Sequence, residues 1–438
     1  MKLVNFKGIN QFQKKHTAGI DITPMRPTEF YNVPLKLKNI IESEPVVQIG
    51  DEVKQGTLLA KPSGNFGVNI YSPISGKVLN IYSKPTLSGE NSKHILIMND
   101  NKNEYEDLSS IESVNDATLI QRLREAGMVD TISKMPTYLK YAYIGNKSYR
   151  SLIVMLDSTD PNNTVNQTLA EFKTEEVVNG AKYFMNITNA QYITFVFTEA
   201  NRKLAAKFKK HILETKKNYD FKIKFIPNKY PFDNPYILTN LVLNRKIRKG
   251  TSFLDAGITI ESAEACYNFC RAVEFDKPVT GKIVTIDGDN VIRKGNYLVQ
   301  NGLSFEHMYE FIGIEDKDTT NVLIDGNVMT GVAQFDKDVS VSLMTDTLVL
   351  LKYDEYDEQE EFPCISCGRC ASVCPVFINP REIETAYLDE RHDDIEKFNA
   401  QACIECGCCS YVCPSRRYLT QRIAAAKHYE KVNKGGAK

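Results

Sequence analysis

The feature of this sequence that most constrains its fold is the clustering of its cysteines. Nine of the 11 cysteines lie between residues 364 and 413, in two runs that share the spacing C-x2-C-x2-C-x3-C-P. In bacterial ferredoxins with this spacing, three thiolates of one run hold one [4Fe–4S] cluster and the fourth ligates the other cluster. The spacing therefore predicts two [4Fe–4S] clusters, each held by thiolates from both runs.

The ligands of each cluster follow from this crossed pattern, in which the fourth cysteine of each run ligates the cluster of the other run. The first cluster is predicted to be held by Cys364, Cys367, Cys370 and Cys413, and the second by Cys403, Cys406, Cys409 and Cys374. Zinc is the rival interpretation, but zinc sites usually take four ligands as two separated C-x2-C pairs, whereas two identical runs supply eight ligands here. The 28 residues between the runs, 375–402, include a helical pattern and exceed the spacing of small ferredoxins. A longer, helical dicluster module is therefore expected.

Three cysteines remain outside these sets. Cys408 is surplus to the eight ligands, and we expect a packed thiol beside the second cluster. Cys266 and Cys270 are four residues apart on a predicted helix, and two thiols cannot complete a cluster. Because free cysteine behaves as a small apolar residue, we expect both of them in a hydrophobic core.

The rest of the chain predicts a multidomain protein with α/β and β parts. Short apolar runs divided by glycine turns in residues 46–79 predict a barrel-sandwich domain of the biotinyl and lipoyl type within residues 1–110. Alternating strand and helix patterns predict a Rossmann-like α/β domain with a parallel sheet at 111–270. Glycine-interrupted strands followed by a helix predict a β-grasp (SLBB-like) module at 271–352. An acidic linker at 353–362 then precedes the helical dicluster ferredoxin domain, 363–438.

The charge balance limits the partners. The chain has 54 Lys and Arg against 55 Asp and Glu, a net charge of −1, so no basic field favours a nucleic acid partner. No apolar run is long enough for a transmembrane helix, so direct insertion in a membrane is not expected. The N-terminal residues lack the apolar segment of a signal peptide. We expect a cytoplasmic protein, or a peripheral subunit held at the cytoplasmic face of the membrane by other subunits.

Further motifs accompany this domain order. They are Phe6-Lys7-Gly8-Ile9, Pro227-x-Lys229-Tyr230-Pro231, Asp255-x-Gly257, Gly295-Asn296-Tyr297, the loop from Asp325 to Gly331, and the SYVCPS segment at 410–415. With both cysteine runs, they resemble the RnfC family, a component of the Rnf complex, the ion-translocating ferredoxin:NAD⁺ oxidoreductase, over nearly the whole chain. The resemblance implies membrane subunits as partners, and an FMN and NAD(H) site in the α/β domain.

The nucleotide loop departs from that family pattern. Family members have G-x-G-G-A-G-F-P-T-x-x-K, but residues 130–140 read DTISKMPTYLK, without a glycine. Backbone amides must approach phosphate closely at such a loop, and Asp130 would repel it. In losing this loop the domain resembles NqrA, the corresponding component of the Na⁺-translocating NADH:quinone reductase. We therefore expect FMN and NAD(H) binding to be weak or absent, with Thr137 and Lys140 as candidates for a residual anion contact.

Two more elements of the family site are altered. The N-A-A-E-C-E-P element corresponds to MLDSTDP at 155–161, where Ser158 and Asp160 replace both glutamates. A glycine-containing turn after Tyr230-Pro231 corresponds to Phe232 through Pro235. The three alterations are predicted to converge on one pocket.

The predicted function is that of a peripheral electron-transfer subunit in an Rnf-like, membrane-associated oxidoreductase complex of anaerobic metabolism, with no catalytic residues or NADH dehydrogenase activity of its own. One alternative is a soluble electron-transfer adaptor for a non-translocating reductase, such as an amino-acid reductase system, with a redox partner protein. Another is an RnfC protein that uses NADH and FMN through an altered loop.

Overall fold

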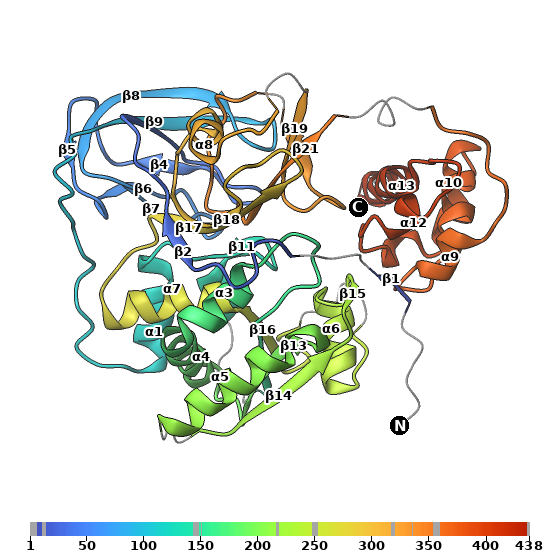
Figure 1. The fold of residues 1–438 in the computed structure, drawn as a ribbon, viewed down its shortest axis with the longest axis horizontal. Coiled ribbons are helices and arrows are strands. Elements are labelled where there is room, and N and C mark those ends of the chain that lie inside the picture. Colours follow the sequence, from blue (N-terminus) through green and yellow to red (C-terminus); the bar gives the residue numbers. More distant parts are fainter. Residues whose placement is uncertain are drawn as a thin grey trace.

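The computed structural model describes residues 7–10, 15–142, 149, 151–215, 219–247, 253–316, 320–334, 336–353 and 360–435. Phe6 and most of the predicted acidic linker, 354–359, lie outside the described residues. Figure 1 shows two β-rich parts side by side at the top, an α/β part below them, and a helical lobe at the right that carries the C-terminal residues.

The N-terminal barrel is built from two antiparallel sheets. One has the order β3-β9-β8-β5, with β3 (Phe30–Pro34), β5 (Glu52–Val53), β8 (Gly76–Pro85) and β9 (Asn91–Asn99). The other has the order β4-β6-β7, with β4 (Ser43–Pro45), β6 (Leu58–Pro62) and β7 (Ile70–Tyr71). Apolar side chains from both sheets, including Val33, Leu59 and Ile97, are fully buried between them. The predicted barrel-sandwich domain is confirmed.

A six-stranded sheet of order β2-β18-β17-β21-β19-β20 adjoins the barrel. Its members are β2 (Ile22–Pro24), β17 (Gly281–Gly288), β18 (Gly295–Gln300), β19 (Asn321–Asp325), β20 (Val332–Gln334) and β21 (Thr347–Lys352), and α8 (Phe305–Ile312) follows β18. Its buried side chains, such as Val284 and Leu350, share one hydrophobic core with the barrel residues Val33 and Ile97. The two β-rich parts therefore pack against each other around this shared core.

The middle of the chain forms a parallel sheet of order β14-β13-β12-β16. The strands are β12 (Ser151–Met155), β13 (Ile193–Thr198), β14 (Phe221–Ile226) and β16 (Ile258–Ser262). The helices around it are α1 (Asp116–Glu125), α2 (Thr137–Tyr141), α3 (Val165–Phe172), α4 (Thr174–Thr188), α5 (Arg202–Glu214), α6 (Pro235–Leu243) and α7 (Ala263–Glu274). Short strands β10 (Val129–Asp130) and β11 (Met135–Pro136) precede α2. Cys266 and Cys270 on α7 are fully buried, as predicted.

The C-terminal lobe has its own small core, which includes Ile383, Ile395 and Ile423. Its helices are α9 (Arg369–Val373), α10 (Pro380–Leu388), α11 (His392–Lys397), α12 (Cys408–Tyr411) and α13 (Leu419–Gly435). The predicted helical character of this lobe is therefore confirmed. Among the helices of the described residues, none combines the length and the apolar character that a membrane crossing requires.

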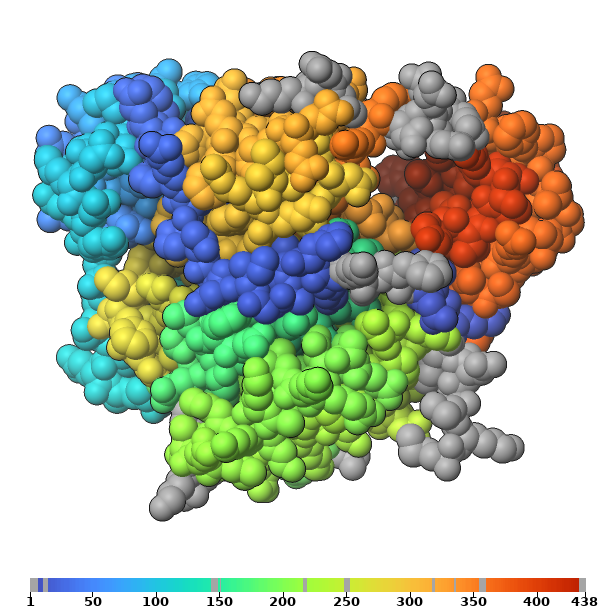
Figure 2. All heavy atoms as spheres, viewed as in Figure 1, coloured from blue at the N-terminus to red at the C-terminus, as the bar shows by residue number. Residues whose placement is uncertain are grey.

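The N-terminal segment connects these parts. Its strand β1 (Ile9–Asn10) pairs with β15 (Lys229–Tyr230) of the α/β part, whereas β2 joins the six-stranded sheet. Between them, Thr17 is fully buried, with its hydroxyl 2.6 Å from that of Thr164. Figure 2 shows this blue segment lying between the yellow six-stranded sheet and the green α/β part.

Candidate metal centre

Both cysteine runs fold into the same loop. In the first, the backbone N–H of Ser366 donates to the Sγ of Cys364 at 3.4 Å, and in the second the N–H of Glu405 donates to the Sγ of Cys403 at the same distance. Ser366 and Glu405 both have a positive φ, 58° and 57°. Hydrogen bonds to cluster-ligating sulfur stabilise the thiolate and tune the redox potential. The repeated loop is therefore suited to two similar clusters.

In each run, a glycine lies where the loop ends and a short helix begins. Gly368, with φ 71°, precedes α9, and Gly407, with φ 81°, precedes α12. This left-handed backbone conformation costs other residues about 1–2 kcal/mol. Cys374 follows α9, at its carboxyl end, and Pro375 comes next in the chain. Because proline cannot continue a helix, the fourth thiol of the run is held at the point where the helix stops.

Four thiols from the two runs gather at one place. Cys374, Cys403, Cys406 and Cys409 line a single small cavity, together with Cys408. The pKa of the Cys409 thiol is raised to about 12, first by burial and then by the neighbouring Cys406, Cys403 and Cys374. These four are the residues that the spacing assigns to the second cluster, and Cys374 reaches it from the first run.

One thiol of the second run also influences the first run. The pKa of the Cys370 thiol is raised by burial and, to a smaller extent, by Cys413 and Cys364. Cys413 of the second run is thus close enough to Cys370 of the first run to influence its thiol. Cys367 is exposed within the same loop.

The two thiol sets differ in exposure. Residues 362–369 are all exposed, including Cys364 and Cys367, and the side chain of Ile365 is 66% exposed. Three thiols of the second set are buried instead. The first set thus lies at the surface of the lobe and the second in its interior.

Residues from the rest of the chain cover the second set. Cys408 is fully buried in an apolar contact with Ile9, Tyr230 and Met329, in agreement with a packing role for this thiol. Burial raises the pKa of the Tyr230 hydroxyl, and the nearby Cys406 adds to the effect. The paired strands β1 and β15 and the loop that contains Met329 therefore lie directly against the second cysteine run.

The two donor sets fit iron–sulfur clusters. Each brings together thiols of both runs, and thiolate is the usual ligand of such clusters. Among the described residues, no group of three or more Cys, His, Asp or Glu side chains is arranged to hold a single metal ion. When bound, a [4Fe–4S] cluster supplies one-electron transfer.

The predicted nucleotide loop is closed by its own side chains. The Nζ of Lys140 donates to Asp130 at 3.0 Å, to Glu261 at 2.6 Å and to the carbonyl of Ile260 at 2.5 Å. Both carboxylates are buried, and they raise the pKa of Lys140 above its usual value although burial opposes them. The charge of Lys140 is therefore satisfied within the protein. Thr137 is fully buried, and its hydroxyl has no partner among the described residues.

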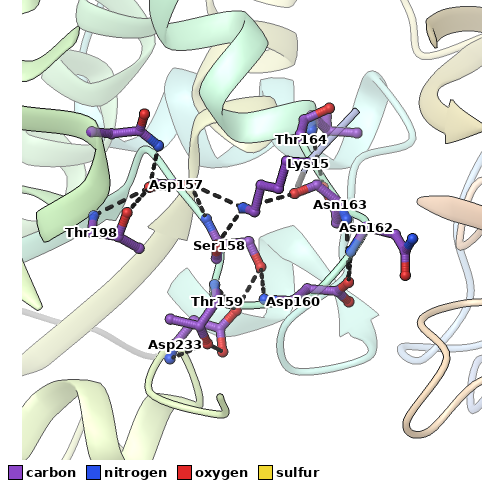
Figure 3. A network of polar contacts seen from close by, with 12 residues as sticks. Lys15, Asp157, Ser158, Thr159, Asp160, Asn162, Asn163, Thr164, Thr198 and Asp233 are labelled. Atoms are coloured by element: carbon purple, nitrogen blue, oxygen red, sulfur yellow. Dashed lines mark hydrogen bonds and ion pairs between the residues drawn. The ribbon is translucent and has the colours of Figure 1, made fainter. Parts of the chain in front are cut away.

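A lysine from the N-terminal segment lies at the carboxyl end of β12 (Figure 3). The Nζ of Lys15 is 3.2 Å from the Oδ1 of Asp157 and donates to the carbonyls of Ser158 at 2.5 Å and Asn163 at 3.1 Å. Burial opposes ionisation of Asp157, but Lys15 and a hydrogen bond from Thr198 hold its pKa below the usual value. An internal ion pair therefore occupies this edge of the sheet.

The residues after Asp157 bind the turn that follows the cis peptide bond between Tyr230 and Pro231. Asp233 accepts hydrogen bonds from the hydroxyl of Ser158 at 2.6 Å, and from the N–H and hydroxyl of Thr159 at 3.0 and 2.6 Å (Figure 3). Two of the three altered family elements thus contact each other.

FMN does not fit the α/β part in this arrangement. In open α/β sheets, phosphates bind beyond the carboxyl ends of the strands, on free backbone amides. Here Lys15 pairs with Asp157 at that edge, and Lys140 pairs with Asp130 in the loop that would hold the phosphate. The loop contains no glycine, and its acidic residue would have to lose its partner before an anion could approach.

Comparison with known proteins agrees with the barrel and the dicluster domain, whereas the α/β part matches a family of FMN-binding domains. Three family models match the chain: the RnfC barrel sandwich hybrid domain at residues 5–102, the Nuo51 FMN-binding domain at 123–271, and the 4Fe-4S dicluster domain at 356–414. The chain is 29% identical to the C component of the proton-translocating ferredoxin:NAD(+) oxidoreductase complex of Clostridium ljungdahlii, over 84% of this chain and 80% of that one. It is 26% identical to the C component of the ion-translocating oxidoreductase complex of Rhodobacter capsulatus, over 86% and 73%.

A solved structure shares the fold. A chain of an NAD⁺-reducing [NiFe]-hydrogenase in the H₂-reduced state superimposes with a TM-score of 0.51 at 13% sequence identity. The match covers 72% of this chain and 57% of that chain, so it extends over little more than half of the hydrogenase chain.

Proposed function

We propose that this chain, which resembles RnfC proteins over most of its length, is a peripheral electron-transfer subunit of an Rnf-like oxidoreductase complex. The curated relatives are named as subunits of ion-translocating complexes, and the dicluster domain supplies an electron-transfer module. The observation that carries the proposal is the crossed gathering of thiols, in which Cys374 joins the second run and Cys413 the first.

We assign the first cluster to Cys364, Cys367, Cys370 and Cys413, and the second to Cys403, Cys406, Cys409 and Cys374. The loop that carries the first set is exposed from residue 362 to 369, so a partner redox protein can approach this set closely. The second set lies against β15 and the Met329 loop. An electron that enters at the protein surface would therefore reach the first cluster before the second.

FMN and NAD(H) are not part of the proposed mechanism, because the groups that would receive them already pair with one another. Thr137 and Lys140 remain the candidate anion contacts, and an anion there would compete with Asp130 and Glu261 for Lys140. We also place the protein at the cytoplasmic face of the membrane, bound to membrane subunits.

We also propose the limits of the domains and the fold types of the two middle domains. The domain limits are 1–110, 111–270, 271–352, 353–362 and 363–438. The strand order of the parallel sheet supports a Rossmann-like domain, and the mixed six-stranded sheet with α8 supports a β-grasp module.

Anaerobic purification tests the proposal. We expect about eight irons per chain, from two four-iron clusters, no stoichiometric flavin, and co-purification with membrane subunits. A protein that contains zinc and lacks broad visible absorbance would contradict the cluster assignment. Recovery with a soluble reductase and without membrane subunits would favour the adaptor alternative, and bound FMN would favour the NADH-using alternative.

A further inference from the structure

A polar cavity lies where the barrel, the six-stranded sheet and the altered nucleotide loop meet. Its volume is about 240 Å3. Its charged lining includes Lys38 from the barrel, Lys134 from the turn between β10 and β11, Asp160 after β12, and Asp325 and Asp346 from the six-stranded sheet region. We call this space the lysine–aspartate cavity.

The opposite charges named above line the same cavity without pairing. None of its five residues named above forms an ion pair with another described residue. Lys134 and Lys38 are nevertheless close enough to Asp325 to lower its pKa in part. The lining therefore holds cations and carboxylates that influence one another without forming ion pairs.

The carboxylates repel one another. Burial raises the pKa of Asp325 to about 7, with a further contribution from Asp346, and burial raises the pKa of Asp160 to about 6, with contributions from Asp346 and Asp233. A buried group of like charges is costly unless a cation compensates it. The cavity therefore favours a ligand that carries a positive charge.

A buried hydroxyl in the cavity wall also favours a polar ligand. Ser340 lines the cavity and is only 4% exposed, yet its hydroxyl has no hydrogen-bond partner among the described residues. A buried hydroxyl without a partner is unfavourable by about 1–3 kcal/mol, which a polar ligand would recover.

A single metal ion is not the ligand that this arrangement suits. Among the residues that the structure describes, no three carboxylate, imidazole or thiol groups converge on one ion position. The lining instead offers both carboxylates and lysines to one ligand, and these residues come from different parts of the fold.

We propose that the lysine–aspartate cavity binds a small zwitterion of amino-acid size, with its ammonium group toward Asp160, Asp325 and Asp346 and its carboxylate toward Lys38 and Lys134. The volume lies below the range of about 300–1,000 Å3 that is typical of drug-sized ligands, which also excludes a dinucleotide.

The cavity is connected to the second cysteine run. The loop from Asp325 to Gly331 lines the cavity, and Met329 in this loop packs against the apolar cluster that contains Cys408. A bound zwitterion would therefore alter the surroundings of the second cluster. This coupling rests on the proposed function, whereas binding itself does not.

Titration of the anaerobically purified full chain tests the proposal. Each of the twenty L-amino acids is added separately, and binding is measured by calorimetry and by the shift in melting temperature. We expect saturable binding of at least one amino acid, and at least about a tenfold loss of affinity for both its N-acetyl derivative and its amide, since each lacks one charge.

Variants locate the site. Asp325→Asn and Lys134→Met are each expected to weaken binding about tenfold or more, whereas Asp289→Asn, at an exposed position of the same sheet region, should not change it. Absence of binding by all twenty amino acids at millimolar concentration would overturn the proposal. So would equal affinity for the blocked derivatives. Binding without any change in the cluster spectrum would overturn the coupling alone.

Discussion

The backbone carbonyl of Met329 lies so close to Gly407 that a Cβ atom on this glycine would come within 2.6 Å of the carbonyl oxygen. At the equivalent glycine of the first run, Gly368, a Cβ atom would meet no atom within 4 Å. Both glycines have a positive φ, so the two positions differ in their surroundings rather than in their backbone. Alanine variants at these two glycines therefore separate the effect of backbone strain from the effect of the contact with Met329.

Gly368→Ala should therefore destabilise the protein by the left-handed strain alone, about 1–2 kcal/mol. Gly407→Ala should cost more and should also loosen the second cysteine run from the Met329 loop, because the backbone contact cannot accommodate a methyl group. Anaerobic unfolding and iron content after purification measure both effects. Equal losses in the two variants would show that the Met329 contact does not constrain the run.

The crossed ligand sets predict which cluster each fourth cysteine supports. Cys413→Ser should damage the first cluster, since Cys413 is close enough to Cys370 to influence its thiol, and Cys374→Ser should damage the second. Electron paramagnetic resonance of each reduced variant should show the loss of a different signal, with about four irons remaining. Loss of the second-run cluster in Cys413→Ser would reverse the assignment.

The sequence predicted the cysteine chemistry because the spacing of a cluster loop is local. Ligands within one run are a few residues apart, and the loop geometry repeats at Ser366 and Glu405. Strands β12 and β13 were likewise predictable, because each is a short apolar run bounded by helical patterns, and β14 because apolar residues alternate with lysines. Strand β16 was not predicted, since it buries Glu261, whose carboxylate pairs with Lys140, a residue distant in the sequence.

The internal ion pair at the sheet edge could not be predicted either. Lys15 and Asp157 are 142 residues apart, and nothing in the sequence around Lys15 distinguishes it from an ordinary surface lysine. The altered elements at Ser158 and Asp233 were recognised as departures from a family pattern, but only the structure shows them bonded to each other. Long-range polar contacts leave no periodic signal in a single sequence.

Removal of that ion pair tests its structural role. Lys15→Met should destabilise the protein by about 3–5 kcal/mol, because it leaves Asp157 buried and uncompensated. Chemical unfolding measures the change. Asp157→Asn in the same variant should restore part of the loss. The matched control is Lys210→Met, since Lys210 pairs with Glu214 at the surface and such pairs contribute about 0.3–0.5 kcal/mol. Similar effects of the two lysine variants would exclude a structural role for Lys15.

The raised pKa of Asp325, about 7, predicts a pH-dependent stability. The folded protein binds this proton more tightly than the unfolded chain, so the stabilisation is full at acidic pH and is lost as pH rises through about 7. Asp346 adds to the shift, and Lys134 and Lys38 oppose it. Asparagine resembles the protonated carboxyl group and cannot ionise.

Without added amino acids, Asp325→Asn should therefore be more stable than the parent protein at about pH 8, and the difference should shrink toward about pH 5. Thermal unfolding at several pH values measures it, with Asp289→Asn as the exposed control. A variant that is less stable than the parent at about pH 8 would show that the carboxylate is stabilised in the folded protein.

The closed nucleotide loop predicts the response to pyridine nucleotide. NADH added to the anaerobic, iron-loaded protein should leave its visible absorbance unchanged, because Lys140 is held by Asp130 and Glu261 and no glycine amide is free to receive a phosphate. Dithionite serves as the control and should bleach the same sample, which establishes that the clusters can be reduced. Added FMN should not alter this result, since Lys15 and Asp157 already pair at the sheet edge. Rapid bleaching by NADH alone would mean that the loop opens to the nucleotide, and the chain would then oxidise NADH itself.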